Sequence, residues 1–487
     1  MQPVAAIKER PLSRDNTAQG TVEALSRASL QRPDVRAWCS SMVFLSTSVS
    51  IGAMTCGALI LKSRQVLPEF LNDTCATANG LEVVWTGIRK YKKNHFAFPS
   101  TAASSMLIQV FANIIITLFL DAHARVNFTA MLWLLQKESG NGPRYNTNSR
   151  FLGGTKKFGP CHWTTNIVAA VAIAIGYGGA ATLTARIHTS GICDKEFNIL
   201  GPPIYTAWGV DISGYPLVML GGALWVQSLI SIWTLILIFG PEKKTIKTWS
   251  SDPVVNAVFM ILTGGMYFAD PRNHTQRPLR MSVYKQVSRV RWLVRVIWVA
   301  FAILATCLVI TAYFAKQQGS FAIDQIQGDD WTGFGFVQAP IGPTSLVTDW
   351  AGVLIQSGMS GLLAFFMHCA DVVAYFMNDD VSWQDAYSRY AEDPDAFVPK
   401  LWRFKWRNLV LFVAKSSIQW VFGYATSVDA VFTVSFVPLA VVTTIMLLVA
   451  ITLETMARYK PHDGGPTTYG EFRLLIKYIT QHHLIWL

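Results

Sequence analysis

The chain has 487 residues and a formal net charge of +11, and 51% of its residues are hydrophobic while only 15% are charged. Soluble domains carry about 25% charged residues, so this composition argues against an ordinary soluble protein and favours a membrane protein. The basic residues lie between long apolar runs, and no Cys/His finger spacing accompanies them. Nucleic acid is therefore not expected as a partner.

The N-terminal segment, residues 1–37, contains six Lys or Arg residues and no short apolar core. A secretory signal peptide needs such a core. The composition instead predicts a mostly disordered cytosolic tail.

Eight apolar segments follow, and each is long enough to cross a bilayer as a helix. They are Trp38–Leu61, Phe98–Leu120, Trp163–Thr184, Leu217–Phe239, Trp292–Phe314, Trp350–Phe376, Leu409–Ser427 and Ala430–Leu453. The second is expected to stop at Asp121-Ala122-His123, and the seventh is the weakest because it carries Lys415. We therefore predict an all-α polytopic membrane bundle over residues 38–454, followed by a cytosolic tail over 455–487 with a short amphipathic helix.

A further apolar stretch, Val254–Phe268, is too short for a comfortable crossing. It follows Pro253, a residue tolerated in a first helical turn. We predict an interfacial or core-packed helix here. A crossing would raise the number of spans to nine and invert the topology downstream.

The basic residues outside the spans indicate the orientation. Alternate segments carry 30 Lys and Arg residues on one side and 9 on the other, and the richer side is expected to be cytosolic. Both termini are then cytosolic. The first loop is a misfit, because Arg89, Lys90, Lys92 and Lys93 would lie outside.

Two features of the loops predicted to lie outside concern modification. Cys75 and Cys193 are the only cysteines in these loops, and the exoplasmic side is oxidising, so a disulfide between them is predicted. Asn72 is the one N-glycosylation sequon on this side.

Four polar residues lie within the sixth and seventh spans. His368 and Asp371 share one helix face, as do Lys415 and Gln419. The two spans run antiparallel, so we expect Asp371 to meet Lys415 and His368 to meet Gln419. Ionisable groups in a membrane either clamp helices together or mark a proton or substrate pathway, and a lysine can also extend its side chain to the interface. All three interpretations remain open here.

An acidic cluster follows the sixth span. Asn378-Asp379-Asp380 with Asp385 is similar to clusters that hold magnesium and diphosphate, but enzymes of that kind need two clusters and only one is present. A solvated helix cap is the favoured interpretation. We find no histidine box, nucleophile elbow or phosphate-binding glycine loop, so no catalytic residue, metal or cofactor is predicted.

Two of the spans contain several small residues. Ser357 and Gly361 form a small-xxx-small pair in the sixth span, and the third contains Gly176, Gly178 and Gly179. Residues of this kind let membrane helices approach closely.

Six short motifs occur in a characteristic order: Ala130-Met131-Leu132-Trp133, Tyr145-Asn146-Thr147-Asn148-Ser149-Arg150, Thr248-Trp249-Ser250-Ser251-Asp252-Pro253, His368-Cys369-Ala370-Asp371, Trp420-Val421-Phe422-Gly423 and Pro466-Thr467-Thr468-Tyr469-Gly470. In these motifs the chain, from about Leu120 to near its end, resembles a family of uncharacterised multi-pass membrane proteins of filamentous fungi. That family often has Glu where Asp371 stands, and a longer acidic tail after Tyr478. The resemblance implies membrane class and fungal origin but no activity.

Three functions are compatible with these observations. The leading hypothesis is a non-catalytic membrane scaffold, sensor or transport-associated protein. The alternatives are a secondary transporter that uses His368, Asp371 and Lys415, and a membrane enzyme acting on lipid or isoprenoid near Asp379 and Asp380. The expected partners are the bilayer and an unidentified small molecule or lipid. A cavity at the level of His368 would favour transport. A cytosolic pocket lined by carboxylates would favour an enzyme, and a solid bundle would favour the leading hypothesis.

Overall fold

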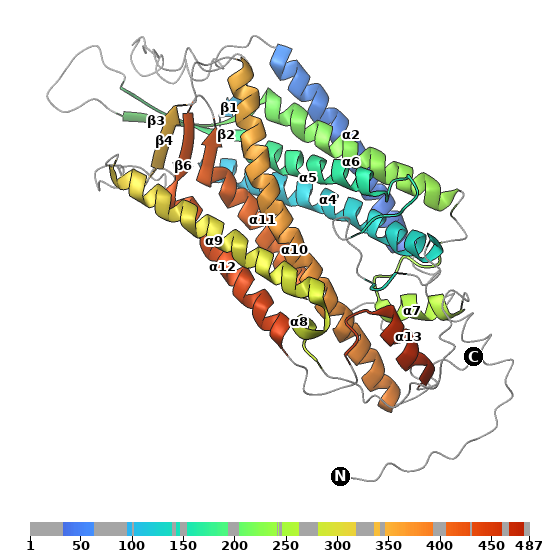
Figure 1. Ribbon diagram of the computed structural model, residues 1–487. Coiled ribbons are helices and arrows are strands. Elements are labelled where there is room, and N and C mark those ends of the chain that lie inside the picture. The colour runs from blue at the N-terminus through green and yellow to red at the C-terminus, as the bar shows by residue number, and fades with distance from the viewer. Residues whose placement is uncertain are drawn as a thin grey trace, which may run out of the picture.

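A computed structural model describes residues 33–62, 95–99, 102–138, 143–146, 153–192, 204–240, 242, 246–262, 281–317, 336–340, 346–392, 406–428, 431–459 and 467–481 (Figure 1). The helices are α2 (Pro33–Lys62), α4 (Ala102–Glu138), α5 (Trp163–Thr182), α6 (Gly214–Phe239), α7 (Pro253–Leu262), α8 (Val283–Gln286), α9 (Ser288–Gln317), α10 (Leu346–Glu392), α11 (Trp406–Ala425), α12 (Phe436–Arg458) and α13 (Phe472–Gln481). The strands are β1 (His95–Pro99), β2 (Thr184–Ile192), β3 (Ile204–Ser213), β4 (Phe336–Pro340), β5 (Thr426–Val428) and β6 (Val431–Ser435).

A long helix occupies most of each predicted span, namely α2, α4, α5, α6, α9, α10, α11 and α12, but the outer residues of the second, third, seventh and eighth predicted spans belong to strands β1, β2, β5 and β6. Within the described residues, seven of these are long and apolar enough to cross a membrane. The exception is α11, whose 20 residues include Lys415 and Arg407. The predicted all-α, membrane-embedded bundle is therefore confirmed, while the eighth crossing and the cytosolic termini stay predictions.

Helix α4 continues far beyond its predicted end. We expected Asp121-Ala122-His123 to stop the span, but the helix runs on to Glu138. His123 is buried, and its two ring nitrogens lie 2.9 Å from Ser231 Oγ and 3.0 Å from Ser46 Oγ, on α6 and α2. The prediction was wrong because neighbouring helices supply partners for these polar side chains.

The N-terminal boundary also differs from the prediction. Residues 33–37, expected to belong to a disordered tail, are the first turn of α2. Pro33 is compatible with this position because the first helical residue needs no backbone N–H partner.

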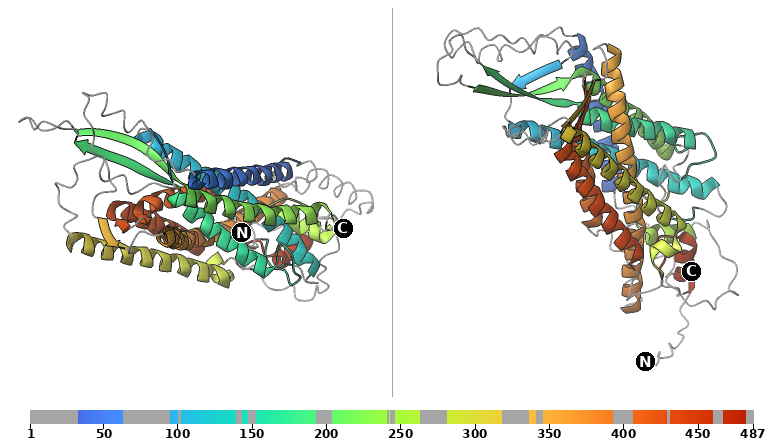
Figure 2. Two further views of the ribbon diagram at one scale, coloured as in Figure 1. Left: turned by 90° about the horizontal axis from the view of Figure 1, so that it is seen from above. Right: turned by 60° about the vertical axis from the view of Figure 1, so that its left-hand side comes forward.

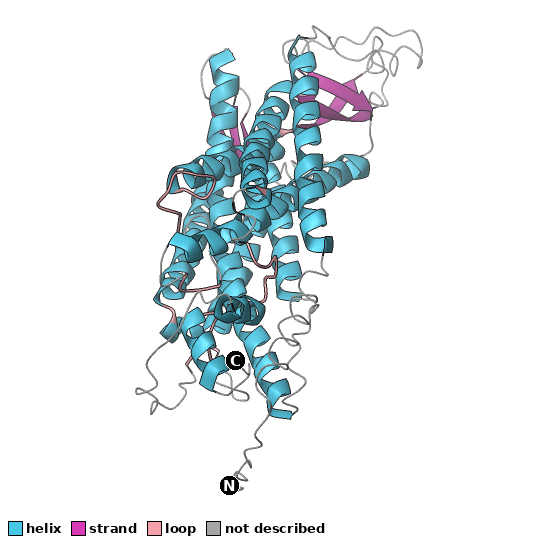
Figure 3. Cartoon of the chain, turned by 90° about the vertical axis from the view of Figure 1, so that its right-hand side faces the viewer, coloured by secondary structure: helices cyan, strands magenta, loops and turns pink. Residues whose placement is uncertain are grey.

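Two small antiparallel sheets, which were not predicted, lie at one end of the bundle (Figure 3). One has the order β1-β3-β2, with Phe98 opposite Val210 and Thr184 opposite Ile212. The other has the order β4-β6-β5. The hairpin of β2 and β3 projects beyond the helices (Figure 2). All six strands come from the first, third, fifth and seventh connections, so these connections meet at the same end, as alternating crossings require.

The opposite end holds the two short helices α7 and α13. Helix α7 begins at Pro253, as predicted, and packs against α13 in a cluster of buried residues. The apolar face of α13 contributes Phe472, Leu475, Ile476 and Ile479, and two tryptophans of the long helices, Trp133 and Trp383, complete the cluster. Both short helices therefore close this end of the bundle.

Small residues bring α5 and α10 into close contact; the sequence indicated close packing for each of these helices but not that they pack against each other. A Cβ added to Gly178 would collide with Ser357, and one added to Gly361 would collide with Ala174. Because no side chain separates the two backbones at these points, the helices lie closer than larger residues would allow. This contact positions the cavity described below, which begins on the same faces of α5 and α10.

Candidate functional site: a charged cavity in the bundle

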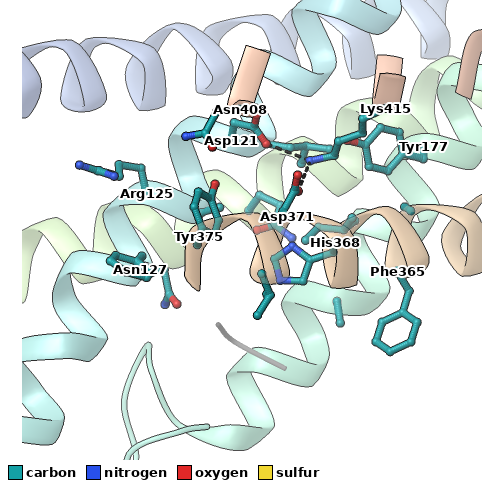
Figure 4. A pocket seen from close by; sticks show the side chains of 18 of the residues that line it. Asp121, Arg125, Asn127, Tyr177, Phe365, His368, Asp371, Tyr375, Asn408 and Lys415 are labelled. Carbon is teal, nitrogen blue, oxygen red and sulfur yellow. Dashed lines mark hydrogen bonds and ion pairs between the residues drawn. The ribbon is translucent and has the colours of Figure 1, made fainter. Parts of the chain in front are cut away.

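A cavity of about 410 Å³ lies between α4, α5, α10 and α11. This volume falls within the roughly 300–1,000 Å³ typical of small-molecule sites. Its polar lining comes mainly from α4, α10 and α11: Asp121, Arg125, Asn127, His368, Asp371, Tyr375, Asn378, Asp379, Asn408 and Lys415. Figure 4 shows most of these side chains pointing toward a common space. The bundle is therefore not solid at the level of His368.

Three charged side chains from three helices form the centre of the cavity, which we call the charged node: Asp121, Asp371 and Lys415 (Figure 4). Lys415 Nζ lies 3.0 Å from Asp121 Oδ1 and 3.5 Å from Asp371 Oδ2. The exposed fractions of the side chains are 9% for Lys415, 16% for Asp371 and 43% for Asp121. One ammonium group thus bridges two carboxylates, and Asp121 is the member most open to the cavity.

The structure brings together only part of the predicted polar set. Asp371 and Lys415 lie side by side, and His368 lines the same cavity one turn away along α10. Gln419 does not meet His368, because its amide donates to the backbone carbonyl of Ser360 at 3.2 Å. The pairing of His368 with Gln419 was therefore wrong.

Asp121 is the member of the node that sequence reasoning missed. It was interpreted as the end of a span, whereas it lies in the middle of α4. A signal was present in the sequence, because no Gly or Pro occurs between residues 100 and 139. An uninterrupted stretch of this kind permits a helix to continue past a single carboxylate.

The wall formed by α5 is apolar apart from Tyr177. Ala170, Val171, Ile173 and Ala174 line the cavity on this side, and Phe365 of α10 continues the surface. The charged node lines the same cavity, so a bound molecule would meet both charged and hydrocarbon side chains.

Asp379 forms the floor of the cavity, toward the end that holds α7 and α13. The amide of Asn146 lies 3.2 Å from each of its carboxylate oxygens and also 3.2 Å from the carbonyl of Ser251. Asn256 holds Asn146 in turn, donating to its side-chain oxygen at 2.8 Å. Connections far apart in the sequence thus meet at one carboxylate.

The segment before α13 closes over this floor. Asp380 Oδ1 accepts backbone N–H groups of Thr468 and Tyr469 at 2.9 and 3.2 Å. Gly470, with φ +70°, packs so closely that a Cβ there would lie 2.6 Å from Asp379 Oδ2. Burial raises the pKa of the Tyr469 phenol, and the Asp380 carboxylate adds to the rise. The phenol therefore stays protonated and donates to the carbonyl of Met281 at 2.8 Å.

The favoured interpretation of the acidic cluster was wrong. Asn378, Asp379 and Asp380 are only 4%, 3% and 4% exposed, and α10 continues to Glu392 instead of ending in a solvated cap. The carboxylates tolerate burial because amide and backbone N–H donors from distant segments satisfy them. Asp385 lies further along the same helix and does not line the cavity.

Other predictions are not tested. Cys75, Cys193 and Asn72 lie outside the described residues, so the disulfide and the glycosylation site stay predictions. Among the described residues, no group of three or more His, Cys, Asp or Glu side chains is arranged to hold a metal ion. Comparison of the chain with protein families, curated proteins and solved structures finds no match.

Proposed function

We propose that this membrane protein is a secondary transporter of a small molecule, and that the cavity between α4, α5, α10 and α11 is its substrate site. The observation that carries the proposal is the charged node inside a cavity of about 410 Å³ within the membrane-embedded bundle. Ionisable residues within membrane segments commonly mark substrate or ion pathways. A solid bundle would instead have favoured a scaffold.

The lining limits the chemistry of the substrate. The apolar wall of α5 suits a hydrocarbon portion, and the node suits a charged or strongly hydrogen-bonding group. A small amphipathic molecule fits both. A purely ionic substrate would leave the wall of Ala170, Val171 and Ile173 without a role.

The cavity also has a geometry that suits transport. The floor at Asp379 is covered by two short segments, one with Asn146 and one with Thr468 and Gly470. One end can therefore open without dismantling the bundle, as alternating access requires.

An enzyme is the second candidate, and Asp379 is the observation that favours it. This carboxylate lies at the cytosolic end of the cavity under the predicted orientation. Its two oxygens, however, already accept from Asn146, so it is held as a structural acceptor. A transported substrate requires no chemistry from it.

The proposed relationship to the fungal family gains an argument from the fold. Three of the motifs that carry the resemblance contribute to the floor of the cavity. Asn146 comes from one, Ser251 from the second, and Thr468 and Gly470 from the third. A shared floor is what a family with a common cavity would retain.

The transport proposal is tested by substrate accumulation. Proteoliposomes containing the protein are incubated with a small-molecule extract of fungal cells, washed, and analysed by mass spectrometry. At least one compound should accumulate with the wild type and not with Lys415→Met, which removes the cation of the node. Glu242→Gln, which alters a carboxylate paired with Lys137 and outside the cavity lining, should behave as the wild type. Identical contents in wild-type, Lys415→Met and protein-free liposomes would contradict the proposal.

A further inference from the structure

The charges of the node do not balance. Asp121 and Asp371 share the single ammonium of Lys415, which leaves one net negative charge when both carboxylates are ionised. Two carboxylates beside one cation behave differently from a simple ion pair, because the second carboxylate experiences repulsion from the first. The predicted pairing of Asp371 with Lys415 alone would have been neutral.

Charged residues around the node do not remove this excess. Arg125 and Asp379 also line the cavity, and their charges cancel each other. In Figure 4 the Arg125 side chain points away from Asp371. The other titratable groups facing the node are His368 and Tyr375 of α10 and Tyr177 of α5, and Tyr residues are neutral near pH 7.

A net charge in a membrane-embedded cavity is unfavourable and needs compensation. We propose that the node binds one proton, carried by Asp371, and that this proton is the coupling ion of the transporter. The proposal rests on the transport function above. With Asp371 protonated, Lys415 and Asp121 remain as a neutral ion pair.

Geometry selects Asp371 over Asp121 as the proton carrier. Asp371 is the less exposed carboxylate, at 16% against 43%, and it lies farther from the ammonium, at 3.5 Å against 3.0 Å. Its charged form is therefore less well solvated and less well paired. Protonation of Asp371 weakens the longer contact, between Asp371 and Lys415, and keeps the shorter one, between Asp121 and Lys415.

His368 is the competing proton site, because it lies one turn from Asp371 and lines the same cavity. Protonation of an imidazole would also neutralise the node. The two sites are separable by spectroscopy, since a protonated carboxyl group has a C=O stretching band that an imidazolium lacks.

The test is infrared spectroscopy of the full-length protein in liposomes, titrated from acidic to alkaline pH. The wild type minus Asp371→Asn difference should contain one protonated-carboxyl band that disappears as the pH rises. His368→Gln should keep this band. Glu454→Gln, which alters a carboxylate bonded to Trp298 at 2.6 Å and outside the cavity lining, is the matched control and should also keep it.

Two further variants check the charge balance. Asp121→Asn leaves Asp371 paired one to one with Lys415, so the band should move to lower pH by about 1–3 units. Lys415→Met removes the cation and should move the band to higher pH. Each measurement includes a gel-filtration profile to verify folding.

Absence of a titrating carboxyl band in the wild type, or its persistence in Asp371→Asn, would overturn the proposal. So would a band insensitive to both Asp121→Asn and Lys415→Met. The spectroscopy requires no transported substrate. A missing band together with intact substrate accumulation would therefore contradict the bound proton but not the transport function. A correct band without accumulation removes the transport function instead.

Discussion

Lys415 and Asp121 are 294 residues apart in the sequence, yet Lys415 Nζ lies 3.0 Å from Asp121 Oδ1 inside the bundle. This contact joins α11 to α4 and converts an expected pair into a node of three charges. The position of the node inside the bundle, its cavity and its unequal charge are the features from which the proposed function follows.

Removal of Lys415 should harm the fold more than removal of Asp371. Lys415→Met leaves two carboxylates beside each other without a cation, at a cost of roughly 3 kcal/mol, the lower end of values for a broken buried pair. Asp371→Asn leaves the pair of Lys415 and Asp121 intact and should cost about 1 kcal/mol. Thermal unfolding of the detergent-solubilised protein provides the comparison. Equal losses of thermal stability in the two variants would mean that Asp121 does not form a stabilising ion pair with Lys415.

The contact between α5 and α10 should be sensitive to a single methyl group. Gly178→Ala places a Cβ on top of Ser357 and should destabilise the protein by about 1–3 kcal/mol. Gly176→Ala, two residues away on the same helix, is the matched control. The added Cβ would lie 3.6 Å from its nearest neighbour, which is an ordinary contact. The measurement is the melting temperature of each variant. A Gly178→Ala protein as stable as Gly176→Ala would show that α5 and α10 are not in close contact.

The closure of the cavity floor should depend on Gly470. Gly470→Ala is disfavoured both by φ +70° and by the approach of Asp379 Oδ2 to 2.6 Å. We expect faster amide hydrogen exchange across Phe472–Gln481, because the segment is no longer held against α10. Gly358→Ala, whose Cβ would have no neighbour within 4 Å, serves as the control. Unchanged exchange in Gly470→Ala would argue that this turn does not hold α13 in place.

Topology can be tested at the two ends of the bundle. Reporter fusions after Lys316 and after Tyr459 should read lumenal and cytosolic respectively, because α9 ends beside the sheets and α12 ends at the opposite side. The same reading from both fusions would contradict an alternating arrangement of eight spans.

The sequence was sufficient for the class of fold and for much of the helix arrangement. Long apolar runs predicted the helices, and the small residues of the third and sixth spans indicated close packing without naming the partner helix, because both signals depend on local composition. The ends of α4 and α10 were misjudged because a carboxylate stops a span only where no partner is available. Those partners, such as Lys415 for Asp121 and Thr468 for Asp380, lie far away in the sequence.

The candidate site was predictable only in part for the same reason. Lys415 and Asp371 attract attention as ions in apolar segments. Asn146, by contrast, is an ordinary amide in a connection, and its role at Asp379 follows from the convergence of two connections on α10. The two sheets were missed because their strands are short and are paired across connections that the helices bring together.

The central claim is that the cavity is reached by water from both sides of the membrane in turn. A protein with its seven native cysteines replaced by serine and one cysteine introduced as Ala170→Cys, on the cavity wall, would be exposed to a membrane-impermeant thiosulfonate reagent from each side separately. Leu362→Cys, an exposed position outside the cavity lining, is the lipid-facing control and should not react from either side. We predict labelling of Ala170→Cys from both sides. Labelling from one side only, or from neither, would contradict transport through this cavity.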